Sequence, residues 1–302
     1  MLGAAALAAL AACELLARAL HPQPLLGPAR FLPAMRASPA ELAEAARDRR
    51  AFKVVGLGDS IMYGSGLARE QTYLELLGPR LQAALRRPVR VLNLAVPAFN
   101  TVQESAALRE LGLAVGPDLV IVHFWEDDVR EYPFAAAAGR LWELRPGMSD
   151  EVLAALPLPG PVRRPLLRHS RAFQLLSWAA WALRARGSAG RAGQAWPQAL
   201  ASIQDAAARS GARVLLLLSP RLEQGPLGPA RGELYARVRL WAEGLGMEVM
   251  DLGEALRGRP GRDVGLDDCH FNALGQRLVA EALAARLLGP AGAARRRKSP
   301  RS

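Results

Sequence analysis

The sequence predicts an α/β protein whose parallel sheet is covered by helices on both faces. Short runs of consecutive apolar residues alternate along the chain with longer segments of helical character. A strand that is an unbroken apolar run is buried on both faces, and alternation of strands with helices is typical of parallel sheets joined by crossover helices. The chain has 302 residues, of which 51% are hydrophobic, so it is long enough to bury a substantial core.

The elements follow one another in order from residue 52. The apolar runs predict five strands, at 52–57, 89–94, 119–124, 213–218 and 247–250. The segments between and after them predict helices at 71–87, 102–113, 199–210, 233–245 and 273–288. In such folds ligands bind outside the carboxyl ends of the strands. The residues that directly follow each strand are therefore the candidates for a functional site.

Composition and charge exclude several classes of protein. The net charge is +11, but five of the cations lie in the last eight residues, and the remaining excess is scattered rather than gathered in a stripe, so we expect no nucleic-acid partner. Charged residues interrupt every apolar run before about 18 residues, which excludes a polytopic membrane protein. Two cysteines, Cys13 and Cys269, exclude a disulfide scaffold and a cysteine-built zinc site. We expect neither a metal nor a cofactor.

The first twenty residues predict export or attachment to a membrane. Residues 2–12 form an apolar, alanine-rich run with the length of a secretory signal core, and Leu10-Ala11-Ala12-Cys13 is similar to a bacterial lipobox. We interpret 1–20 as a signal, lipoprotein-like or membrane-anchor segment. An ordinary alanine-rich helix packed on the domain is the alternative.

The rest of the chain divides by composition into four further segments. Residues 21–50 are rich in proline, alanine and arginine and are expected as a linker with a short helix at 39–50. The main domain is expected at 51–289, and within it 131–197 breaks the alternation and is interpreted as an insertion with one helix at 172–183. Residues 290–302 are a basic tail, expected to be disordered.

One serine is placed for chemistry at the end of the first strand. Gly58-Asp59-Ser60 follows the run at 52–57 directly and precedes a glycine-containing turn. A serine at a strand-to-helix turn presents its hydroxyl at the carboxyl edge of the sheet, and its backbone N–H is free to bind an oxyanion. By itself the motif is equally typical of a turn in which Ser60 caps a helix.

A second polar segment, Asp267-Asp268-Cys269-His270, lies just before the last helix. Histidine is the usual base for a serine because its pKa lies near neutrality. A carboxylate three residues earlier can hold the other imidazole nitrogen and stabilise the imidazolium. A helix-entry loop with polar caps is the alternative. A serine at one strand end together with Asp-x-x-His at another favours nucleophilic catalysis.

With these residues in place, the sequence resembles the SGNH (GDSL-type) hydrolase family from about 52 to 288. The blocks that carry the resemblance are 55–60, 93–101, 124–129 and 267–270, in the family's order and spacing. The resemblance implies a flavodoxin-like three-layer α/β/α fold. It also implies Ser60 as nucleophile, His270 as base and Asp267 as the residue that orients the base.

The resemblance also implies where the oxyanion binds, and there the sequence departs from the family twice. The donors would be the Ser60 amide, the amide of Ala98 and the side chain at Asp127, with Asn100 as a neighbouring candidate for substrate binding. Ala98 stands where the family has glycine, and Asp127 where it has asparagine. An ionised carboxylate cannot donate a hydrogen bond, and loss of one such donor costs on the order of 10²–10³ in rate.

Three accounts of Asp127 remain open. The carboxyl is held protonated among the neighbouring Glu126 and Asp128, since crowded carboxylates disfavour one another's charge. Alternatively, the alignment of the block is shifted and another group makes the third contact. The third account is that the enzyme is weakened or repurposed.

Together these features predict a serine ester hydrolase of the cell envelope, exported, periplasmic or membrane-anchored. It would cleave O-acyl, acetyl or lipid esters through a Ser60 acyl-enzyme, on a small-molecule, lipid or acylated-glycan substrate. One alternative is an acyltransferase of the same fold that acts on an envelope polysaccharide. The other is a catalytically weakened binding module, which Asp127 favours and the intact Ser60 and His270 segments disfavour.

Overall fold

The structure of the protein is a computed structural model. The residues it describes are 2–20, 26–27, 35–97, 99–129, 134–137, 140–143, 158–188, 195–223, 225–226, 228–230 and 232–290. The chain divides into two compact units: the larger is Ala34–Val129 with Gln194–Ser302, and the smaller is Met1–Pro33 with Arg130–Gly193.

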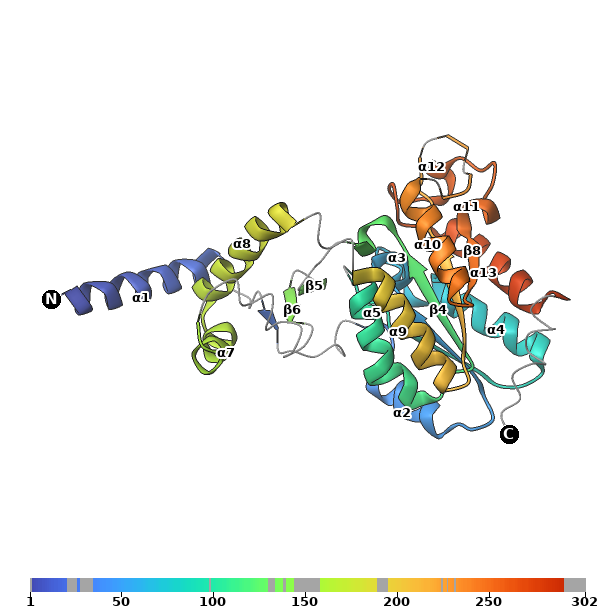
Figure 1. The fold of residues 1–302 in the computed structure, drawn as a ribbon, viewed down its shortest axis with the longest axis horizontal. Helices are drawn as coiled ribbons and strands as arrows, with labels where there is room; N and C mark the ends of the chain where they lie inside the picture. Colours follow the sequence, from blue (N-terminus) through green and yellow to red (C-terminus); the bar gives the residue numbers. More distant parts are fainter. Residues whose placement is uncertain are drawn as a thin grey trace. The chain divides into compact units, whose positions relative to one another are not determined.

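A five-stranded parallel sheet forms the centre of the larger unit (Figure 1). Its strands are β2 (Phe52–Leu57), β3 (Val89–Asn93), β4 (Leu119–Phe124), β7 (Arg213–Leu218) and β8 (Glu248–Asp251). They lie in the order β3-β2-β4-β7-β8, and every neighbouring pair is parallel. The predicted fold class is therefore confirmed. Every residue of β2 and β4 is buried, as the unbroken apolar runs indicated.

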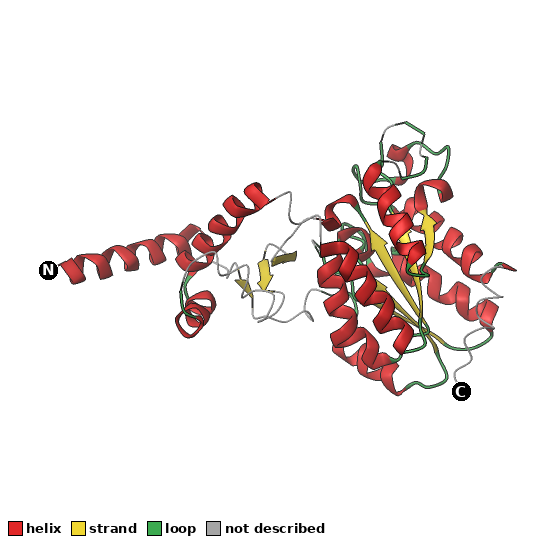
Figure 2. Cartoon of the chain, viewed as in Figure 1, coloured by secondary structure: helices red, strands yellow, loops and turns green. Residues whose placement is uncertain are grey.

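Helices cover both faces of this sheet, which makes three layers (Figure 2). On one face α4 (Tyr73–Leu85) packs against α13 (Ala273–Leu288), and on the other α9 (Ala195–Arg209) packs against both α5 (Thr101–Ala107) and α10 (Glu233–Gly244). Shorter helices are α2 (Pro39–Arg47), α3 (Ser60–Tyr63), α11 (Leu252–Ala255) and α12 (Gly261–Val264). Single turns of 3-10 or π helix are formed by Arg69–Gln71, Leu108–Gly112, Leu113–Val115 and Glu126–Val129.

The apolar core follows from these layers. Between the sheet and the α4–α13 pair, Tyr73, Leu74, Leu77, Val279 and Leu283 are all fully buried. The strand order also determines where a ligand can enter. Because β3 lies on one side of β2 and β4 on the other, the connections on the two sides of β2 run in opposite directions, which leaves space at the carboxyl end of β2.

The structure assigns part of the expected linker to the larger unit. Ser38 caps α2 through the Glu41 N–H while the Glu41 carboxylate accepts the Ser38 N–H, which forms a capping box. Arg90 of β3 bonds to Glu44 at 2.7 Å and so ties α2 to the sheet edge. Composition alone suggested a linker because the segment is rich in proline and arginine. The ion pair that ties α2 to the sheet joins Glu44 to Arg90, which are 46 residues apart in the chain. Local composition does not reveal such a contact.

The described residues of the smaller unit form three helices and a small sheet. α1 (Leu2–Leu20) packs against α8 (Arg171–Ser188), which is preceded by α7 (Gly160–His169). The sheet has the order β1-β6-β5, from Leu26–Gly27, Arg140–Glu143 and Phe134–Ala137, and was not predicted. The helix expected at 172–183 lies within α8. No helix in the described part of the chain combines the length and the apolar character that crossing a membrane requires. The expected basic tail lies outside the described residues from 291 onward.

Candidate functional site

Ser60 is the first residue of α3, directly after the carboxyl end of β2. The buried Asp59 caps this helix, and its Oδ1 accepts the Ile61 N–H at 2.8 Å. Gly64 then ends α3 with φ of 75°, and a Cβ at this position would lie 2.4 Å from the Thr72 side chain. Only glycine adopts this turn cheaply. The short helix therefore stops after one turn and leaves the half-buried Ser60 at the sheet edge, where its N–H belongs to the unpaired first turn of a helix.

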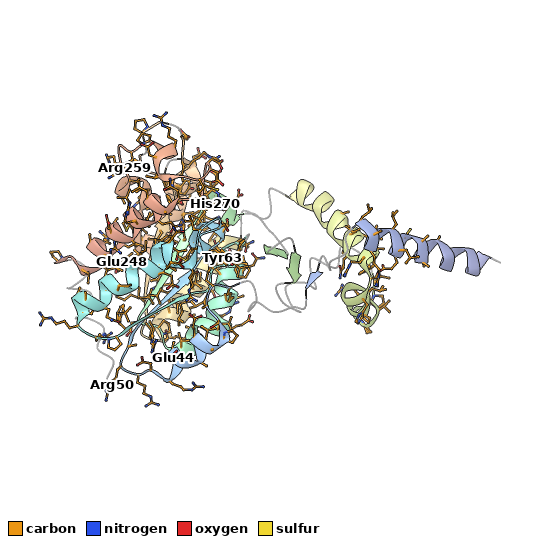
Figure 3. The ribbon with its side chains drawn as sticks, turned by 180° about the vertical axis from the view of Figure 1, so that it is seen from behind. Glu44, Arg50, Tyr63, Glu248, Arg259 and His270 are labelled. Carbon is orange, nitrogen blue, oxygen red and sulfur yellow. The ribbon has the colours of Figure 1, made fainter. Side chains whose placement is uncertain are left out.

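His270 lies on the loop before α13 and reaches Ser60 across the sheet edge; Figure 3 labels it. Its Nε2 is 2.8 Å from Ser60 Oγ, and its Nδ1 is 2.8 Å from Asp267 Oδ2. The Asp267 Oδ1 accepts the backbone N–H groups of His270 at 2.7 Å and Cys269 at 2.9 Å. The three side chains predicted from two distant motifs thus form one hydrogen-bonded chain.

Asp267 is held as an anion in this arrangement. Burial acts to raise its pKa, but the N–H groups of His270 and Cys269 and the His270 ring outweigh it and lower the pKa of Asp267 to about 2. A negatively charged Asp267 fixes the Nδ1 proton of His270, which leaves Nε2 as the acceptor that faces Ser60.

The loop that carries Asp267 and His270 is fixed at both ends. Leu266 donates its N–H to the His270 carbonyl at 2.7 Å, which closes the turn on itself. Asn272 then caps α13, since its side-chain oxygen accepts the N–H groups of Leu274 and Gly275 at 2.9 and 3.0 Å. The imidazole is therefore positioned by backbone contacts as well as by Asp267.

Cys269 contacts the ring of His270. Its Sγ is 3.3 Å from His270 Nδ1. Burial, together with the charge of Asp267, raises the pKa of the Cys269 thiol to about 12, so the thiol is neutral. Asp267, Cys269 and His270 also form a group with metal-ligand atoms close together. A neutral thiol and a carboxylate already bonded to His270 make a poor donor set for a metal.

Asp127, in the turn Glu126–Val129 after β4, lies beside the nucleophile segment. Its charge contributes to raising the pKa of both Asp59 and Asp128, after the larger effect of burial. The side chain is half-buried. Its role as the third oxyanion contact, which the resemblance implies, stays a prediction.

The two acidic neighbours of Asp127 have partners of their own. Glu126 forms an ion pair with Arg221, which also bonds to Asp268 at 2.9 Å. Asp128 is buried and accepts the Trp125 N–H at 2.6 Å. The expected crowding among three consecutive carboxylates is therefore only partly present, because Glu126 is neutralised by Arg221 at the surface.

The two other residues proposed for oxyanion or substrate binding have different outcomes. Ala98 lies outside the described residues. Asn100 is buried and caps α5: its side-chain oxygen accepts the Gln103 N–H at 3.1 Å, while Gln103 accepts the Asn100 N–H at 2.8 Å. The structure thus gives Asn100 a role in starting the helix that follows the second block.

A set of buried acidic groups lies behind Ser60, and the sequence did not predict it. Glu104 on α5 is buried, and neither of its carboxylate oxygens has a hydrogen-bond partner among the described residues. Burial raises the pKa of Glu104 well above its usual value, the charge of Asp59 adds to this, and burial likewise raises the pKa of Asp59 to about 6. The sequence did not single out Glu104, because most of α5 is buried and the helix has no alternation of an apolar face with a polar face.

His123 lies in the same buried region and has a structural role. Its Nδ1 lies 2.7 Å from the Tyr73 hydroxyl, and both side chains are fully buried. Burial lowers the pKa of His123 to about 3, so its ring is neutral. It is therefore not a second base for the site.

A cavity of about 420 Å³ lies at the same edge of the larger unit. Its lining includes the charged residues Glu126, Arg221, Glu223 and Arg257. Arg221 joins this cavity to the His270 loop through Asp268, and its guanidinium lies 5.6 Å from the centre of the Trp125 ring. A polar space therefore adjoins the loop that carries the base.

Comparison with known proteins agrees with this geometry. The model of the GDSL-like Lipase/Acylhydrolase family matches residues 57–278, which includes both Ser60 and His270. The chain belongs to this family. Membership makes it a carboxylic ester hydrolase and confirms the resemblance seen in the sequence. None of the curated protein sequences matches it significantly.

The solved structures to which the chain is similar share little sequence identity with it. A mutant of Axe2, an acetyl-xylooligosaccharide esterase from Geobacillus stearothermophilus, is 17% identical, with coverage of 80% of this chain and 95% of that one and a TM-score of 0.48. TesA is 21% identical, with 78% and 99% coverage and a TM-score of 0.42. LAE5, from the metagenome of Lake Arreo in Spain, is 17% identical, with 79% and 96% coverage and a TM-score of 0.45.

Proposed function

We propose that the protein cleaves O-acyl esters through a covalent acyl-enzyme on Ser60, and that it does so at the cell envelope. One observation carries the mechanism: Ser60 Oγ, His270 and Asp267 form a continuous hydrogen-bonded chain with two distances of 2.8 Å. A hydroxyl within hydrogen-bond distance of a base, which is in turn oriented by a carboxylate, is the arrangement that activates a serine.

The proposed reaction has two halves. In the first, His270 Nε2 takes the Ser60 proton while Oγ attacks the ester carbonyl, and the protonated ring then gives this proton to the departing alcohol. In the second, His270 takes a proton from water, the resulting hydroxide cleaves the acyl-enzyme, and Ser60 recovers its proton. Asp267, as an anion, stabilises the imidazolium in both halves.

The polar cavity beside the His270 loop favours a hydrophilic alcohol as the part of the ester that leaves. Arg221 and Arg257 donate hydrogen bonds, and Glu126 and Glu223 accept them, so the lining matches a hydroxylated leaving group such as a sugar. A long aliphatic chain would leave these charged groups without water. We therefore propose an acylated glycan or a similar polar ester, with a small acyl group, ahead of a lipid.

A weakened enzyme that mainly binds its ligand is the second candidate, and Asp127 favours it. A carboxylate at the third oxyanion contact repels the charge that develops on the carbonyl oxygen. An acyltransferase differs from the proposed hydrolase only in using a sugar hydroxyl in place of water. Product analysis in the presence of a soluble glycan acceptor separates these two reactions, because transfer yields an acylated glycan.

The nucleophile is tested without knowledge of the substrate. The full-length protein is incubated with a fluorophosphonate probe, and the intact mass is measured. We expect one added probe on the wild type and on Ser65→Ala, a matched variant of a nearby half-buried serine, and none on Ser60→Ala. A folded wild type that takes up no probe would refute an activated Ser60 and support the binding protein instead.

A further inference from the structure

The helix that begins with Ser60 is too short to hold its own shape. α3 has four residues, whereas isolated helices of fewer than about 12–15 residues are marginal in water. Within the turn, the Gly64 N–H reaches the carbonyls of Ser60 and Ile61 at 3.1 and 3.2 Å. The last two carbonyls, of Met62 and Tyr63, accept hydrogen bonds from side chains elsewhere in the chain. The position of Ser60 therefore depends on contacts that the rest of the fold supplies.

One arginine, Arg36, binds the end of this helix. Its Nε donates to the carbonyl of Tyr63, which Figure 3 labels, at 2.8 Å. Its Nη2 donates to the carbonyls of Gly64 and Leu67, each at 3.0 Å. The guanidinium carbon also lies 4.2 Å from the centre of the Tyr63 ring, within the range of a cation–π contact. The planar fork of an arginine satisfies these three carbonyls in a fixed arrangement, whereas a lysine ammonium is a point charge on a flexible stem.

The short segment that contains Arg36 is itself attached to the sheet. The Ala37 N–H donates to the Asn93 carbonyl at 2.9 Å, at the end of β3. The buried side-chain amide of Asn93 in turn donates to the Met62 carbonyl at 3.1 Å. Arg69 Nη1 donates to the Arg36 carbonyl at 3.2 Å. The half-buried Arg36 therefore cross-links the end of β3 to the end of α3.

Arg36 lies upstream of the residues that the family model matches. That match begins at residue 57, and composition suggested only a linker around Arg36. In the structure Arg36 comes two residues after Ala34, at which the larger unit begins. The turn that contains the nucleophile therefore depends on a residue from the segment that precedes the matched domain.

Contacts at both ends of α3 set the direction of the Ser60 side chain. Asp59 accepts the Ile61 N–H at 2.8 Å at one end, and Arg36 binds the carbonyls at the other. Between these two contacts, Ser60 Oγ lies 2.8 Å from His270 Nε2. A displacement of about 1 Å at a reacting group can cost about 10² in rate. A small rotation of α3 would lengthen the hydrogen bond from Ser60 to His270 and slow the attack.

From these observations we infer that Arg36 is a positioning residue for the nucleophile: by binding the carbonyls at the end of α3, it keeps Ser60 Oγ within hydrogen-bond distance of His270. Arg36 acts through the helix and takes no part in making or breaking bonds. The inference rests on the proposed function of Ser60 and extends the machinery of that reaction to a residue outside the family match.

Two substitutions of Arg36 in the full-length protein test the inference. For each variant, kcat and KM with a soluble activated ester and the rate of fluorophosphonate labelling are measured at a temperature at which circular dichroism shows it folded. In Arg36→Ala we expect kcat and the labelling rate to fall by about 10- to 10²-fold with KM little changed, because a misplaced nucleophile slows attack rather than binding. Arg36→Lys should lose less, since it keeps the charge without the fork. Should Arg36→Ala not fold, Arg36→Lys gives the answer alone.

Arg90→Ala is the matched control. Arg90 also ties the segment before β2 to the sheet, but its ion pairs go to Glu44 and Asp48, at α2 rather than α3. We expect Arg90→Ala to keep the wild-type kcat and labelling rate. Two results would overturn the inference while Ser60 remains the nucleophile: wild-type rates in a folded variant of Arg36, or an equal loss in Arg90→Ala. A wild type that takes up no probe would refute the proposed function, and this inference with it.

Discussion

Ser60 Oγ and His270 Nε2 lie 2.8 Å apart although the two residues are separated by 210 positions in the chain. The distance is set by the sheet, because β2 delivers Ser60 to the edge at which the loop before α13 delivers His270. Asp267 is local to His270, three residues away, so only one long-range relationship is needed to assemble the three side chains.

Removal of either partner should abolish ester cleavage. In Ser60→Ala and in His270→Ala we expect kcat to fall by about 10⁵- to 10⁶-fold, because serine and base act as a unit. The double variant should be no slower than either single variant. Steady-state kinetics with a soluble activated ester provides the measurement, and additive losses in the double variant would contradict a shared step.

Asp267→Asn should impair the reaction less than loss of the base. The amide cannot stabilise the imidazolium and favours the wrong tautomer of His270, a change that costs up to about 10⁴ in kcat in a buried triad. Because the Asp267 side chain is 51% exposed, we expect a loss nearer 10²–10³. Asp263→Asn, at a side chain 54% exposed outside the hydrogen-bonded chain, is the control and should leave kcat unchanged.

Asp127→Asn should preserve or raise kcat. At the third oxyanion contact that the resemblance implies for this position, the amide supplies a donor, and one such donor is worth on the order of 10²–10³ in rate. The substitution also removes a negative charge that acts on Asp59. Comparison of kcat for wild type and variant across pH 5–9 gives the result. A loss of activity in Asp127→Asn would mean that the carboxyl itself takes part in the reaction.

The buried acidic groups should make the protein more stable in mild acid than at neutral pH. The pKa values of Asp59, Glu104 and Asp128 are all raised in the folded state. At a pH between the pKa of such a group in the unfolded chain, near 4, and its pKa in the folded protein, the native state binds more protons than the unfolded chain. Stability therefore falls as pH rises through this window, which for Asp59 extends to about pH 6.

Glu104→Gln should flatten this dependence, because the neutral side chain has the same shape and binds no proton. We expect the decrease in Tm between pH 5 and pH 8 to be smaller in Glu104→Gln than in the wild type. The difference reflects the one proton that Glu104 binds in the folded protein and the glutamine cannot bind. The surface variant Glu233→Gln should behave as the wild type. Identical pH profiles for Glu104→Gln and wild type, measured by calorimetry, would show that Glu104 is ionised in the folded protein.

Most of the sheet could be predicted because it depends on local patterns. The runs at 52–57, 119–124 and 213–218 are continuous and apolar, and the structure places strands with these same bounds. The helix predicted at 102–113 was less well defined, since α5 ends at Ala107 and passes into π and 3-10 turns. The helix propensity of single residues does not specify where backbone hydrogen bonds change from α-helical to π or 3-10 spacing.

The sequence by itself determined the fold class and the family, and it indicated Ser60, Asp267 and His270 as candidates for the site. Strand burial, turn residues and the Asp-x-x-His spacing are all features of short stretches of chain. Only the tertiary structure decided which carboxylates are buried near Asp59, that Arg221 neutralises Glu126, and that Arg36 bonds to the end of α3. Each of these contacts joins residues far apart in sequence. Burial and hydrogen bonding then set the charge of each group, and both are properties of the neighbours that folding supplies rather than of the residue itself.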